Sequence, residues 1–86
     1  MLYLLGDKII GPVGLQHAQM DDDAIIVLIK DGVFLDLQSV QGKKIYAIEE
    51  DVKRRGMGGR LKDKADVIGY DKLVDLIFEH KVTNYL

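Results

Sequence analysis

Acidic side chains follow the ends of all four strands that the sequence predicts, and carboxylates grouped in this way could bind a cation. They are Asp7, Asp31, Glu49 and Asp71. In an open α/β sheet the carboxyl ends of the strands line the ligand crevice, so these side chains could meet there around Mg²⁺ or beside a nucleotide. Each acid also stands close to a predicted helix start, where a carboxylate is stabilised without any ligand. We favour this local interpretation and keep a ligand pocket at the strand ends as the alternative.

A basic segment is the second group of residues that could bind a partner. Residues 53–64 contain six bases and one acid, in a protein whose formal net charge is -2. A glycine-rich backbone beside bases can hold phosphate or an RNA backbone, but the Gly-Lys-Ser/Thr ending of a nucleotide-binding P-loop is missing. The sequence predicts a glycine-rich loop over 57–64, which is either merely solvated or docks an acidic protein or tRNA. The candidate contacts are Arg54, Arg55, Arg60 and Lys62, together with Tyr85 as an anchor for a neighbouring subunit.

The sequence predicts no catalytic residue, metal site or cofactor. It has no cysteine, which excludes disulfides, thiolate metal sites and cysteine nucleophiles. His17 and His80 are far apart and lack the spacing of metal ligands, and Ser39 has no glycine elbow around it. We therefore expect a protein that is not an enzyme.

The element that must organise the chain is a strand over 24–29. Five consecutive apolar residues, 25–29, leave no polar face, and most of them are β-branched. A strand that is covered by helices on both sides has this pattern, whereas a half-exposed antiparallel strand alternates. The run is too short to span a membrane. We expect it to be a central parallel strand.

Further strands are predicted at 1–5, 44–48 and 65–68, and 82–86 is either a tail or a short edge strand. Helices are predicted at 12–20, 33–40, 49–55 and 71–80. Alternating strands and helices predict a small Rossmann-like α/β fold with three layers and a mainly parallel sheet of four, possibly five, strands. With 86 residues we expect one domain, 1–86, which completes its burial by oligomerising. No signal peptide is recognisable, so we expect a soluble cytoplasmic protein.

Two helices are expected to make the core together with the apolar strand. The spacing i, i+1, i+4, i+7 predicts an amphipathic helix of about two turns, with an apolar face made by Val33, Phe34, Leu37 and Val40. The last helix is predicted to begin with Asp71 as its N-cap. Its apolar stripe is formed by Leu73, Val74, Ile77 and Phe78.

Three stretches of the sequence, taken in order, resemble the DsrH/TusB family of small subunits of DsrEFH-type sulfur-relay assemblies. They are the apolar run with Asp-Gly-Val in Ile25–Val33, the stretch Lys-Ile-Tyr-Ala-Ile-Glu-Glu-Asp-Val-Lys-Arg-Arg-Gly-Met in Lys44–Met57, and Ile68–His80 with its Tyr-Asp-x-Leu-Val core. The resemblance covers nearly the whole chain and is most specific in the second stretch. It implies a Rossmann-like, DsrEFH-like fold.

The resemblance also implies a role beside cysteine-bearing DsrE/DsrF-like (TusD/TusC-like) subunits that pass persulfide sulfur. The sulfur would serve 2-thiolation of the wobble uridine of tRNA or related sulfur trafficking. Some members carry a cysteine after the first strand, which would fall near Gln16–Ala18, and this sequence has none there. Because only a thiolate carries sulfane sulfur, we expect a non-catalytic subunit that acts through protein contacts. A stand-alone homo-oligomer, such as a dimer, that binds a metal or nucleotide is the alternative.

Overall fold

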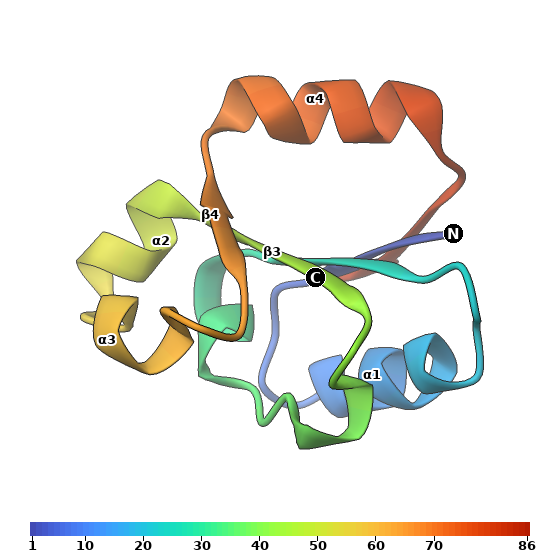
Figure 1. Cartoon of the computed structure of the whole chain (residues 1–86), viewed down its shortest axis with the longest axis horizontal. Coiled ribbons are helices and arrows are strands. Elements are labelled where there is room, and N and C mark those ends of the chain that lie inside the picture. The colour runs from blue at the N-terminus through green and yellow to red at the C-terminus, as the bar shows by residue number, and fades with distance from the viewer.

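The computed structural model describes all residues, 1–86, and places five strands in one sheet (Figure 1). The strands are β1 (Leu2–Leu5), β2 (Ile25–Leu28), β3 (Lys44–Ile48), β4 (Asp66–Ile68) and β5 (Val82–Tyr85). Their order is β4-β3-β2-β1-β5, and every neighbouring pair is parallel. The predicted Rossmann-like α/β fold is confirmed, and the segment 82–86 supplies the fifth strand at an edge of the sheet.

The central strand β2 is buried from both sides, as its uninterrupted apolar run predicts. Ile26 and Leu28 belong to a core cluster of 17 buried residues on one face of the sheet. Val27 belongs to a cluster of six buried residues on the opposite face. All three side chains have 0% exposure. A one-residue change of register would move every side chain of β2 to the opposite face of the sheet. Burial in the two clusters therefore determines the register of β2.

The helices cover the two faces of the sheet unequally. They are α1 (Gly11–Gln19), the 3₁₀ helices η1 (Lys30–Phe34) and η2 (Gln38–Val40), α2 (Glu49–Arg54), α3 (Gly58–Leu61) and α4 (Tyr70–Glu79). Figure 1 shows α4 alone above the sheet, while α1 lies below it. The 17-residue core joins the sheet to α1 and to residues of η1, η2, α2 and α3. None of the helices combines the length and apolar character needed to cross a membrane.

The helix predicted over 33–40 is wrong, because the chain forms two short 3₁₀ helices separated by extended backbone. Leu35 has φ -65° and ψ 149°, which ends η1. The side chain of Asp36 then accepts a hydrogen bond of 3.0 Å from the backbone N–H of Gln38, a local turn that competes with helical bonding. The break buries both Leu35 and Leu37, whereas a continuous helix would turn Leu35 toward solvent.

The start of α4 also differs from the prediction. Gly69, and not Asp71, is the N-cap, and no side chain caps the helix. Asp71 lies within the first turn instead, where its charge favours the positive end of the helix dipole.

The buried face of α4 is narrower than the predicted apolar stripe. Leu73 and Leu76 are the buried residues of this helix. Val74, Ile77 and Phe78 were expected in the core but are 48%, 40% and 86% exposed. A single helix resting on a sheet contacts it only through one side, so apolar residues beyond that side stay in solvent.

Residues 57–64 do not form the predicted glycine-rich loop, because they contain the short helix α3. Met57 and Leu61 are four residues apart and are buried, with 8% and 1% exposure. These two side chains insert into the larger core and order the segment around them. The glycines Gly58 and Gly59 stand at the start of the helix, on its exposed side.

Candidate functional site

Three of the four strand-end acids lie in separate, local environments. Asp7 accepts a hydrogen bond of 2.6 Å from the backbone N–H of Ile9. Glu49 pairs with Lys53, and Asp71 stands in the first turn of α4. No group of three or more His, Asp or Glu side chains is close enough to hold a metal ion, and none of the four acids lines a cavity. The geometry thus supports the local interpretation and gives the strand-end ligand pocket no support.

Asp31, the fourth of these acids, belongs to an ion network that is centred on Arg55. The Arg55 Nε lies 3.0 Å from Asp31 Oδ1, and its Nη1 lies 3.1 Å from Asp51 Oδ1. The side chains of Arg55 and Asp51 are only 20% and 6% exposed. Arg55 therefore ties α2 to η1, and its guanidinium is committed within the chain. The i, i+4 spacing of Asp51 and Arg55 was a signal for this contact, but the distant Asp31 carried none.

The other predicted docking bases divide into paired and unpaired groups. Arg54 Nη2 lies 2.7 Å from Glu50 Oε1, and both side chains are more than half exposed. Arg60 and Lys62 are exposed and form no ion pair or side-chain hydrogen bond, and neither does Lys64. The available positive charge therefore lies on α3 and the residues just after it, and not on α2.

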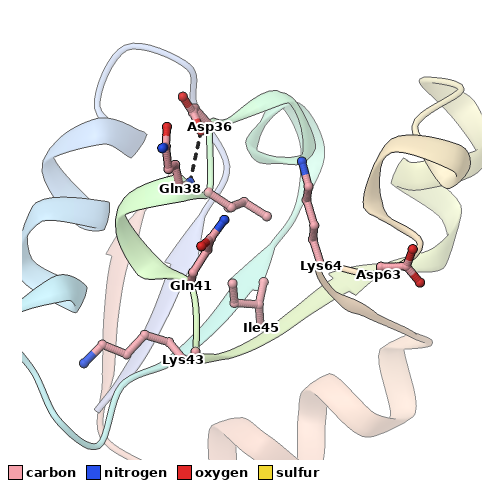
Figure 2. A pocket seen from close by; sticks show the side chains of 9 residues that line it. Asp36, Gln38, Gln41, Lys43, Ile45, Asp63 and Lys64 are labelled. Carbon is pink, nitrogen blue, oxygen red and sulfur yellow. Dashed lines mark hydrogen bonds between the residues drawn. The ribbon is translucent and has the colours of Figure 1, made fainter.

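The largest cavity lies beside the amino end of β3, away from the acids that the sequence singled out. It has a volume of about 440 Å³, and Figure 2 shows Gln38 and Gln41 on one side of it and Lys64 across from them. Its lining is mostly polar and consists of Asp36, Leu37, Gln38, Gln41, Gly42, Lys43, Ile45, Asp63 and Lys64. The sequence did not predict this site. Gln38 and Gln41 reach the cavity because the chain breaks between η1 and η2, and the apolar spacing over 33–40 did not reveal that break.

A second cavity of about 230 Å³ adjoins the first and shares Lys43, Ile45, Asp63 and Lys64 with it. Lys43 Nζ donates a hydrogen bond of 2.8 Å to the backbone oxygen of Asp21. Carboxylates, ammonium groups and amides all line the cavities, so they offer hydrogen bonds and charges of both signs without selecting one ligand class.

Tyr85, the predicted anchor for another subunit, makes contacts within its own chain. Its ring stacks on Tyr3, with centroids 6.4 Å apart and an interplanar angle of 17°. Its hydroxyl lies 2.6 Å from His17 Nδ1. A Cβ on Gly14 would lie 2.7 Å from the Tyr85 ring, so the absence of a side chain there makes room for it. Tyr85 thereby fastens the edge strand β5 to α1.

Tyr3 and Asp21 form a polar contact that the sequence did not indicate. The Tyr3 hydroxyl donates a hydrogen bond of 2.9 Å to Asp21 Oδ2. Burial, followed by this hydrogen bond and the negative charge of Asp21, raises the pKa of Tyr3 to about 12. Hydrogen bonds from the backbone N–H of Asp23 and from the Tyr3 hydroxyl lower the pKa of Asp21.

We predict a loss of stability at alkaline pH that depends on Tyr3. Its pKa is about 12 in the folded chain and about 10 in the unfolded chain, so the folded state keeps its proton longer. The stabilisation is present below pH 10, and roughly 2–3 kcal/mol is lost as the pH rises through 12. Urea unfolding between pH 8 and 12 should show a flatter decline for Tyr3→Phe. The same decline in both proteins would contradict the prediction.

Comparison with known proteins identifies the family. The model of the family described as DsrH like protein matches residues 14–83. Protein TusB of Enterobacter sp. (strain 638) is 31% identical over 58 residues, which are 67% of this chain and 61% of that protein. Protein TusB of Yersinia pestis (strain Pestoides F) is 33% identical over 75 residues, which are 78% of this chain and 77% of the relative.

The matched region differs in extent between relatives. Protein TusB of Yersinia enterocolitica serotype O:8 / biotype 1B (strain NCTC 13174 / 8081) is 32% identical over 59 residues, which are 62% of its length. The chain thus spans somewhat over three fifths of the first two relatives. The family model covers β2, β3, β4 and α4, together with all the residues of the Arg55 network. The chain therefore belongs to the DsrH family.

Proposed function

We propose that this protein is a non-catalytic subunit of a sulfur-relay assembly, in which it supports the transfer of persulfide sulfur between other subunits. The observation that carries the proposal is membership of the DsrH family in a chain of 86 residues without a cysteine. A persulfide forms only on a thiolate, so sulfur bound for an acceptor must be held by another polypeptide. The chain contributes contacts and not the sulfur-carrying group.

The partners of this role are cysteine-bearing DsrE/DsrF-like (TusD/TusC-like) subunits. In the cytoplasm, the sulfur would pass to the 2-position of the wobble uridine of tRNA. The relatives named TusB support this direction, and the proposal extends it to this chain. A domain of this size buries a limited fraction of its surface by itself, which favours completion by other subunits.

The unpaired bases of the chain provide a test of docking to tRNA or to an acidic surface. Arg60→Glu together with Lys62→Glu should lower affinity for such a ligand at least tenfold at low ionic strength, because both side chains are exposed and unpaired. Lys53→Glu together with Arg54→Glu, at bases that already pair with Glu49 and Glu50, reverses the same number of charges as the matched control and should change affinity less. Binding can be measured by fluorescence anisotropy with labelled tRNA and with the purified partner subunits. If the Arg60/Lys62 variant and the control variant lose the same affinity, a docking role for Arg60 and Lys62 is contradicted.

Reconstitution tests the proposed function directly. The chain is co-expressed with the DsrE/DsrF-like subunits of the same genome, and complexes are weighed by native mass spectrometry. We expect a hetero-oligomer that contains the chain, and sulfur transfer to the cysteine of a sister subunit that is faster in its presence. The chain alone should neither bind labelled sulfane sulfur nor transfer it to cyanide. Turnover by the isolated chain, or the absence of any complex, would overturn the proposal.

A further inference from the structure

The outward side of α4 is an apolar surface that the chain itself leaves uncovered. Its residues Tyr70, Val74, Ile77 and Phe78 are between 40% and 86% exposed. At about 100° per residue, the apolar arc runs from Leu76 through Leu73 to Phe78 and covers roughly 200° of the helix. Only Leu73 and Leu76 are buried on the sheet. About half of this apolar arc therefore packs against nothing in the chain.

The sheet beneath α4 is also incompletely covered. This face has six buried core residues, against 17 on the other face. Five more apolar side chains of the strands and their ends remain partly exposed here: Ile25, Ile29, Tyr46, Ile68 and Val82. Figure 1 shows that no second helix lies beside α4 on this side. The exposed side of α4 and this part of the sheet leave apolar surface on the same face of the molecule.

Charge indicates what covers the α4 surface. Beyond Phe78 the helix carries Asp71, Asp75 and Glu79, in that order around its circumference. All three are exposed, and none forms an ion pair within the chain. A second copy packed symmetrically on this surface would bring the same acids together, in a protein that already carries a net charge of -2. An apolar partner surface bordered by lysine or arginine matches both features.

We infer that the outward side of α4, formed by Tyr70, Val74, Ile77 and Phe78, is the surface on which a sister subunit docks, through an apolar groove with a basic rim. This inference rests on the proposed function, because it takes the sister subunit from the proposed assembly. Phe78, at the end of the arc beside the acids, is the most exposed contact, since it is large, aromatic and 86% exposed in the free chain.

The test compares two double variants in the co-expressed assembly. Val74→Lys with Phe78→Lys places cations on the α4 surface, where they remove apolar contact and repel a basic rim. Ile9→Lys with Met20→Lys is the matched control, because these side chains are 85% and 75% exposed and lie outside α4. Circular dichroism and thermal unfolding check that both variants fold. We expect the α4 variant to weaken the hetero-oligomer at least 100-fold and the control to change it less than threefold.

The rim is tested separately, with Asp71→Asn and Asp75→Asn. This variant should weaken the complex about tenfold at low salt, and the difference should shrink as ionic strength rises. A complex that withstands the α4 variant, or that is lost equally in the control, overturns the inference while the proposed function stands. If the asparagine variant binds as tightly as the wild-type chain, the inference that the partner's groove has a basic rim is overturned. A wild-type chain that forms a homodimer through α4, and no hetero-oligomer, overturns both the sister subunit as occupant and the proposed function.

Discussion

Replacing Gly32 by alanine is expected to destabilise the protein by about 3 kcal/mol or more, the largest effect of any glycine-to-alanine change in the chain. A Cβ at this position would lie 1.8 Å from the backbone oxygen of Leu5 and 2.6 Å from its carbonyl carbon. The obstacle is backbone, so no side chain can rotate away. The same Leu5 oxygen accepts a hydrogen bond of 3.0 Å from the N–H of Ile29. Moving the end of β1 to admit the methyl group would therefore also break its hydrogen bond with Ile29, the residue that follows β2.

The measurement is urea or thermal unfolding of the wild-type protein and two variants. For a domain of this size, 3 kcal/mol corresponds to a fall in Tm of roughly 12–24 °C. Gly59→Ala is the control, because a Cβ there meets nothing within 4 Å. Gly59 lies in α3, where alanine favours the helix and should be neutral or stabilising by up to about 1 kcal/mol. A Gly32→Ala protein as stable as the control would show that η1 does not press on β1.

The sequence predicted the strands of the fold but not the break near Gly32. The strands were predictable, because β2 and β3 carry apolar runs whose length and composition suit a covered sheet. The break between η1 and η2 was not, because the i, i+4 pattern of Val33 and Leu37 fits both a helix and two turns that meet the same core. The turn at Asp36, the burial of Leu35 and the close approach of Gly32 to β1 together favour the second arrangement.

The functional surfaces were less predictable than the fold. Ion pairs occupy Arg54 and Arg55 and leave Arg60 and Lys62 free, and the i, i+4 spacing of Glu50–Arg54 and Asp51–Arg55 signals two of these pairs in the sequence. The contact of Arg55 with Asp31, 24 residues away, depends on the fold and has no such signal. Val74, Ile77 and Phe78 of α4 were predicted to be buried and are exposed. Periodicity shows that they share a face of the helix, but it does not show how much of that face the sheet covers.

Substitution of Arg55 by methionine is expected to cost about 2–3 kcal/mol of stability. The change removes the cation that pairs with Asp51, whose side chain is only 6% exposed. Asp51 Oδ2 already has no hydrogen-bond partner, so Arg55 supplies compensation that the surroundings do not. An uncompensated charge in a fully buried pair costs about 3–5 kcal/mol, and we reduce this because Arg55 is 20% exposed. Unfolding in urea, with its midpoint and slope, measures the loss.

Three further variants separate the buried charge from the loss of an ordinary surface pair: Arg54→Met, Asp51→Asn alone, and Arg55→Met combined with Asp51→Asn. Arg54→Met breaks the exposed i, i+4 pair with Glu50 and should cost less than about 0.5 kcal/mol. Adding Asp51→Asn to Arg55→Met removes the stranded charge and should restore part of the lost stability, giving a coupling energy of about 1 kcal/mol or more. Equal losses for the two methionine variants, or strict additivity of the double variant, would mean that Arg55 stabilises the chain by packing alone. Because Arg55 also contacts Asp31, the double variant should keep a residual loss that reflects the broken link between α2 and η1.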